Sequence, residues 1–112
     1  MTNVSPHRSA ADRFTEAVLA DLPEEVAAIR LFGSVARGDE RGVHSDVDLL
    51  VELTSEDPDG SIEEAIRTIA YDIELESGVP VSVIVVPETA VQVRADHPFF
   101  RRVRRDGVAL YG

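Results

Sequence analysis

Apolar residues recur at helical spacing near the start of the chain, over residues 9–22. The positions that share one face of such a helix are Ala10, Phe14, Ala17, Val18 and Leu22. Most of the charged residues in this segment fall on the other face, so the pattern predicts an amphipathic helix. Because proline cannot continue a helix, we expect this one to end before Pro23.

Three later segments have the composition of β-strands. Residues 26–32 are mostly apolar and stop at a glycine, and residues 46–53 begin with alternating carboxylates and apolar side chains. Residues 79–86 are almost continuous Val and Ile, interrupted only by Pro80 and Ser82. A run of this kind is typical of a strand that is covered on both faces, and we expect that here.

A second helix is predicted between the second and third of these strands. Residues 54–60 contain Pro and Gly and form a loop, and Ser61 then precedes Glu64 by three residues, which is typical of a capping box. The expected buried stripe is Ile62, Ala65, Ile66, Ile69, Ala70 and Ile73. Gly78 is the expected end of this helix.

The sequence near the C-terminus predicts a short helix over residues 99–105. A brief apolar segment follows over residues 108–111. The order helix, strand, strand, helix, strand predicts an α+β fold in which helices pack on a small sheet. The 112 residues have the length of one domain, so we expect a single domain over residues 1–112.

The charge of the chain is strongly acidic. Eleven basic residues against 21 Asp and Glu give a net charge of -10, and all eleven are Arg. Binding to nucleic acid by neutralising its phosphates needs a basic surface, so direct nucleic-acid binding is not expected. An acidic surface without Lys is typical of a high-salt interior or of a GC-rich genome, and composition does not separate the two.

Residue types that the chain lacks narrow the chemistry further. It contains no Cys and three scattered His, which excludes disulfides and thiol catalysis and argues against a zinc site. No apolar run approaches the roughly 18 residues of a membrane span, and residues 1–11 contain no apolar leader segment. We therefore expect a cytoplasmic protein without a membrane partner.

The chemistry-bearing residues gather between residues 31 and 51. Asp46 and Asp48 start a strand, where side chains alternate, so both carboxylates point to one face with Cα atoms about 6.5 Å apart. Like charges at this distance favour a bound cation, and oxygen ligands suit Mg²⁺ or Mn²⁺. Gly33 lets the backbone approach a ligand, and the Ser34 hydroxyl with the N–H groups of a following helix start suits an anion. Together they predict metal-bound phosphate, typical of phosphoryl or nucleotidyl transfer.

This constellation resembles the minimal nucleotidyltransferases of the DNA polymerase β superfamily, whose motif is Gly-Ser, about ten residues, and then Asp-x-Asp. Here eleven residues separate Ser34 from Asp46, one more than usual, and a loop residue near Gly42 can absorb the difference. Residues 36–38 are also similar to the family, and residues 98–111 look like the end of many members. The resemblance thus covers roughly residues 31–112.

The resemblance implies a nucleotidyltransferase fold, with a small mixed sheet and helices packed mainly on one face. It implies that Gly33 and Ser34 bind the triphosphate and that Asp46 and Asp48 are the catalytic residues and ligate two divalent metal ions. Arg37 is a further nucleotide-binding candidate, or a surface residue that pairs with an acidic neighbour. Mg²⁺ or Mn²⁺ is the implied cofactor, with ATP the implied substrate.

The resemblance also implies a partner. Family members move a nucleoside monophosphate, often AMP, onto an acceptor hydroxyl, and many act as the antitoxin of a HEPN-class RNase toxin by adenylylating it. Family members place a third carboxylate on the next strand, but in residues 81–86 the only polar residue is Ser82. The alternative is therefore a catalytically weakened or inactive domain that regulates a partner by contact.

Arginines are concentrated near the C-terminus of this acidic chain. Their arrangement fits either a solvated helix face or contact with RNA or with an acidic patch of a partner. The members of this cluster are Arg94, Arg101, Arg102, Arg104 and Arg105.

Overall fold

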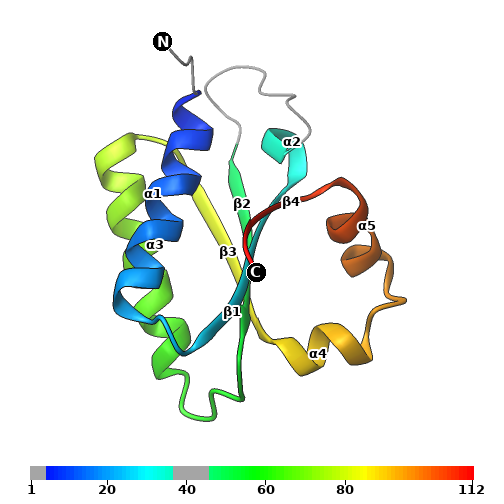
Figure 1. Ribbon diagram of the computed structural model, residues 1–112. Helices are drawn as coiled ribbons and strands as arrows, with labels where there is room; N and C mark the ends of the chain where they lie inside the picture. The colour runs from blue at the N-terminus through cyan, green and yellow to red at the C-terminus, as the bar shows by residue number, and fades with distance from the viewer. Residues whose placement is uncertain (1–4, 37–45) are drawn as a thin grey trace.

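A computed structural model describes residues 5–36 and 46–112. They contain one four-stranded mixed sheet, whose strands lie in the order β3-β2-β1-β4 (Figure 1). The strands are β1 (Val26–Phe32), β2 (Val47–Leu53), β3 (Val81–Pro87) and β4 (Val108–Tyr111). β1 runs antiparallel to both of its neighbours, while β2 and β3 are parallel. The α+β class with a small mixed sheet is therefore confirmed.

Two long helices, α1 (Pro6–Asp21) and α3 (Ser61–Ser77), lie side by side on one face of the sheet (Figure 1). Alternate residues of β2 face them and are buried, namely Val47, Leu49, Val51 and Leu53. α1 starts earlier than its apolar pattern predicts, because the Ser5 hydroxyl accepts a hydrogen bond from the N–H of Arg8 and Pro6 is the first helical residue. This layer holds the main core.

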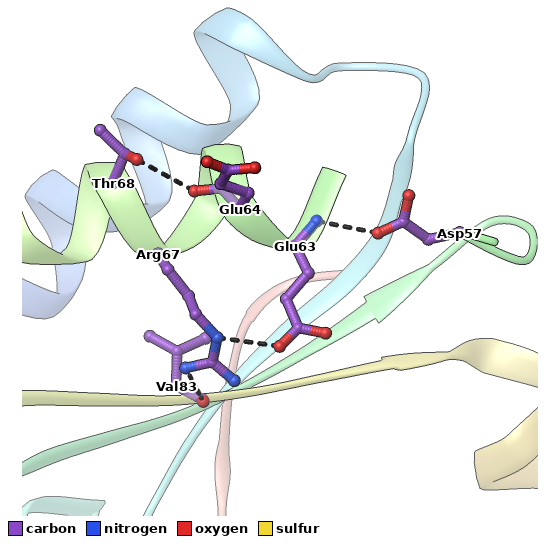
Figure 2. A network of polar contacts seen from close by, with 6 residues as sticks. All are labelled: Asp57, Glu63, Glu64, Arg67, Thr68 and Val83. Atoms are coloured by element: carbon purple, nitrogen blue, oxygen red, sulfur yellow. Dashed lines mark hydrogen bonds and ion pairs between the residues drawn. The ribbon is translucent and has the colours of Figure 1, made fainter. Parts of the chain in front are cut away.

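The start of α3 is capped by a loop carboxylate. The Asp57 side chain accepts hydrogen bonds from the N–H groups of Ile62 at 3.2 Å and Glu63 at 2.9 Å, of which Figure 2 shows the second. Ser61 is the first helical residue, and Gly60, with a φ of 72°, holds the N-cap position. The predicted capping box is therefore wrong, because Ser61 lies one residue past the position from which it could cap.

Side chains of α3 also cover the outer edge of β3, an edge strand of the sheet. The Arg67 guanidinium donates to the carbonyl of Val83 at 3.1 Å and is held by Glu63 at 2.8 Å (Figure 2). The N–H of Val81 donates to the Glu74 carboxylate at 2.9 Å. Backbone groups that would otherwise offer pairing sites to another strand are thereby occupied.

The opposite face of the sheet carries two shorter helices, α4 (Glu88–Val93) and α5 (Pro98–Asp106) (Figure 1). They contact β1, β2 and β3, whereas Ser82 and Ile84 of β3 stay exposed on this face. The expectation that this strand is covered on both faces is therefore wrong, since the short helices reach only part of it. Across the described residues, no helix is both long and apolar enough to span a membrane.

Candidate functional site

The end of β1 and the start of β2 meet at Gly33. β1 passes directly into a single helical turn, α2 (Gly33–Ala36), and Gly33 has a φ of 77°. A Cβ at this position would overlap Oδ2 of Asp48, so the Asp48 carboxylate lies directly against the glycine. The neighbouring residue, Phe32, pairs with Asp48 across the two strands. The structure thus brings together the glycine and one aspartate that the sequence motif names.

Asp46 and Asp48 form an electrostatically unfavourable pair. Asp48 is half-buried and Asp46, just before β2, is exposed. Burial raises the pKa of the Asp48 carboxyl, and the negative charge of Asp46 raises it further. A divalent cation bound by both carboxylates would relieve that repulsion, and the all-oxygen donor set suits Mg²⁺ or Mn²⁺. The residues present therefore fit such an ion.

Two of the predicted nucleotide contacts are not placed. Ser34 belongs to α2 by its backbone, but its side chain is not described. Arg37 lies outside the described residues. The roles assigned to Ser34 and Arg37 therefore stay predictions.

The residue beside Asp48 on the next strand is Ser82. The parallel register of β2 and β3 pairs these two residues directly, and Ser82 is exposed. This pairing puts a neutral hydroxyl where a third carboxylate on β3 would stand closest to Asp48. Within the described residues, no group of three or more His, Asp or Glu side chains is arranged to hold a metal ion.

Other carboxylates near in sequence do not replace the missing group. Glu52 lies on the same face of β2 as Asp48, but it is buried and pairs with Arg30 at 3.2 Å. Glu76 pairs with Arg13 across α1 and α3. Glu88 follows the far end of β3, about 20 Å along the strand from Ser82.

A cavity of about 200 Å³ adjoins Gly33. Its wall combines the end of β1 with α5, which contacts both α2 and β1. The lining residues are Phe32, Gly33, Phe99, Arg102, Val103 and Asp106. Sequence patterns gave Phe99 only as part of the family-like C-terminal segment and Arg102 only as one member of a basic cluster. Neither was assigned to the site, because the packing of α5 on the end of β1 is a long-range contact.

The chain matches the model of a protein family described as "Nucleotidyltransferase domain" over residues 11–107. This span contains the glycine, the two aspartates and the cavity described above. No curated protein matched the chain.

Several solved structures, including the following three, are similar to the chain. A toxin–antitoxin crystal structure with AMP-PNP has a TM-score of 0.61 at 20% identity, covering 90% of this chain and 73% of that one. A mutant toxin–antitoxin MntA-HpeT has a TM-score of 0.57 at 21% identity, with coverage of 88% and 69%. A solved structure described as a "putative minimal nucleotidyltransferase" has a TM-score of 0.57 at 28% identity, covering 96% of this chain and 98% of that one. The first two likenesses show a common fold.

Proposed function

The chain belongs to the nucleotidyltransferase domain family, and from that premise we propose that it binds a nucleoside triphosphate with Mg²⁺ or Mn²⁺ and transfers a nucleoside monophosphate to a hydroxyl of a partner protein. The observation that carries this proposal is the carboxylate pair Asp46 and Asp48 beside Gly33, in which one carboxylate is half-buried with a raised pKa. ATP is the proposed substrate and AMP the transferred group. Residues 1–112 act in this proposal as one domain.

Each residue of the site has a defined task in this proposal. Asp46 and Asp48 hold the divalent ion, which when bound supplies Lewis-acid stabilisation to the reacting phosphate. Gly33 has no side chain to fill the space beside Asp48, so phosphate oxygens can approach the backbone there. Ser34 and Arg37 are proposed to donate hydrogen bonds to the triphosphate.

The proposed partner is a HEPN-class toxin, for which this chain would be the cytoplasmic antitoxin. Support comes from the sequence resemblance to minimal nucleotidyltransferases and from the fold shared with toxin–antitoxin structures. The acceptor in this proposal is a hydroxyl on the surface of the toxin.

A second candidate function is favoured by Ser82. Without a carboxylate beside Asp48, the acceptor hydroxyl lacks one group that could help remove its proton. The chain could then bind and neutralise its partner by contact alone, with slow or no transfer.

Label transfer separates the two functions. The chain is incubated with ATP labelled in the α-phosphate, Mg²⁺ or Mn²⁺, and the protein encoded by the neighbouring gene. Transfer that is lost in Asp46→Asn and Asp48→Asn and kept in Asp72→Asn supports the enzyme, because Asp72 is an exposed carboxylate on α3. Neutralisation of the partner that survives Asp46→Asn and Asp48→Asn, with no label transferred by any variant, supports the binding module and contradicts the transferase.

The rate of label transfer by the variant Ser82→Asp extends this test. It restores a carboxylate in register with Asp48. A faster transfer than wild type would mean that the missing group limits the rate. Mn²⁺ affinity, measured by calorimetry on the same variants, reports metal binding independently of turnover.

A further inference from the structure

The cavity beside Gly33 presents an arginine next to the carboxylate site. Arg102 of α5 lines this space of about 200 Å³ together with Gly33. The Asp48 carboxylate also lies directly against Gly33. Gly33 therefore contacts the Asp48 carboxylate and lines the same cavity as Arg102, so a ligand bound at Gly33 can reach both side chains.

Aromatic packing fixes the position of α5 against this site. The rings of Phe32 and Phe99 meet edge to face with centroids 5.4 Å apart, and Phe100 packs edge to face on Phe99 at 5.2 Å. Phe99 and Arg102 are three residues apart on α5 and therefore share one face of the helix. The contact that anchors Phe99 to the end of β1 thus also directs Arg102 toward Gly33.

Within the described part of the chain, no ion pair or hydrogen bond holds the Arg102 guanidinium. Arg105 pairs with Asp106 at 3.1 Å, Arg30 pairs with Glu52 at 3.2 Å, and no such partner stands against Arg102. Asp106 also lines the cavity, but its carboxylate accepts two hydrogen bonds from Arg105. The cavity therefore offers an anion one uncommitted guanidinium, and the chain contains no Lys that could serve instead.

We propose that Arg102 binds the β- and γ-phosphates of the nucleoside triphosphate and, after transfer, the pyrophosphate in the cavity beside Gly33. This inference rests on the proposed function. In the transfer step the acceptor oxygen bonds to the α-phosphorus, and the bond from that phosphorus to the bridging oxygen breaks. Pyrophosphate leaves with the electron pair of that bond, and the acceptor proton passes to water. A guanidinium matches phosphate geometry with paired N–H donors and stabilises the charge that develops on the leaving group.

The test compares Arg102→Gln with Arg101→Gln. Arg101 is its exposed neighbour on the same helix and carries the same charge, but it lines a different cavity that does not include Gly33. Affinities for ATP, AMP and inorganic tripolyphosphate are measured by calorimetry with Mg²⁺. Arg102→Gln should weaken ATP and tripolyphosphate by about tenfold to a hundredfold and leave AMP within about twofold. Arg101→Gln should leave all three affinities near wild type, and Arg102→Lys should restore part of the loss.

Two outcomes would overturn the inference. One is an equal loss of ATP affinity in Arg101→Gln and Arg102→Gln, which would mean that only the general charge of α5 matters. The other is a loss of AMP affinity in Arg102→Gln as large as that of ATP. Tripolyphosphate separates this inference from the proposed function. If tripolyphosphate binds in an Arg102-dependent way and ATP does not bind, the assignment of the cavity stands and nucleotidyl transfer is contradicted. If ATP binding depends on Asp48 and is unchanged in Arg102→Gln, only the assignment of the cavity is contradicted.

Discussion

Two carboxylates on the same face of β2 lie in opposite environments. Glu52 is buried, and its charge is offset by Arg30 at 3.2 Å. Asp48, four residues earlier, is half-buried against Gly33, and this burial raises the pKa of its carboxyl. Its charged neighbour is another carboxylate, Asp46, which raises that pKa further. The fold therefore pairs charge where two short helices cover the sheet and leaves like charges together at the strand start. An unfavourable arrangement kept beside a glycine and a cavity is typical of a ligand site.

Removing the charge of Asp48 gives the largest expected effect on function, with little harm to the fold. Asp48→Asn should lower Mn²⁺ affinity and label transfer by about a hundredfold or more, since one of two charged ligands is lost. Its melting temperature without metal should equal or exceed that of wild type, because burial and Asp46 both disfavour the charged form in the folded protein. Calorimetry and thermal unfolding in EDTA measure the two properties. Clear destabilisation in EDTA would contradict this contrast between the two carboxylates.

Removing Arg30, the partner of Glu52, should have the reverse effect: stability should fall, and metal affinity should not. Arg30→Ala leaves a buried carboxylate without its cation and should lower the free energy of unfolding by about 2 kcal/mol, less than for a fully buried pair because Arg30 is partly exposed. Denaturant unfolding measures the loss. The double variant Arg30→Ala with Glu52→Gln should recover part of it. Metal affinity of the folded Arg30→Ala protein should stay near wild type, and a large drop would mean that the two carboxylates are coupled.

A side chain at Gly33 tests the close approach on which the site depends. Gly33→Ala places a Cβ against the Asp48 carboxylate in a left-handed backbone conformation, so about 1 kcal/mol of stability should be lost. The displaced carboxylate should also bind Mn²⁺ more weakly. Gly60→Ala is a matched control, because its φ of 72° is similar but no described residue other than its own chain neighbours comes within 4 Å of the added Cβ. Equal Mn²⁺ affinity in the two variants would argue against a role for the contact with Asp48.

The strands and long helices could be predicted from sequence because each carries its own periodic pattern. β1 has the bounds that its apolar run predicts, and α3 ends at Gly78 as expected. The helix α4 and the pairing of residues 108–111 with β1 were missed, because a six-residue helix and a four-residue strand depend on contacts that only the folded chain supplies. Short segments carry too little local signal.

The candidate site likewise has features that the sequence predicted and features that only the folded chain shows. The order of Gly33, Asp46 and Asp48 along the chain was enough to expect these residues at one site. One strand ends just before Gly33, and the next begins between Asp46 and Asp48. The cavity could not be foreseen, because it depends on Phe99 reaching Phe32 from 67 residues away along the sequence. That Ser82 stands beside Asp48 required the register of β2 and β3.

The smallest expected effect comes from a carboxylate whose pKa shifts in the direction opposite to that of Asp48. Asp59 accepts a hydrogen bond from the N–H of Ser61 at the start of α3, which lowers its pKa below the usual value of 3.8. A lowered pKa in the folded state means that charged Asp59 stabilises the fold above pH 4 or so, and that this contribution is lost as the pH falls through the folded-state pKa. Asp59→Asn should therefore unfold at a slightly lower temperature than wild type at pH 7, with the difference vanishing in acid. Asp48→Asn without metal should differ from wild type in the opposite direction at pH 7. Melting temperatures of the two variants across pH 3 to 7 or so test this. If both variants shift the melting temperature in the same direction at neutral pH, the two carboxylates do not lie in opposed electrostatic environments.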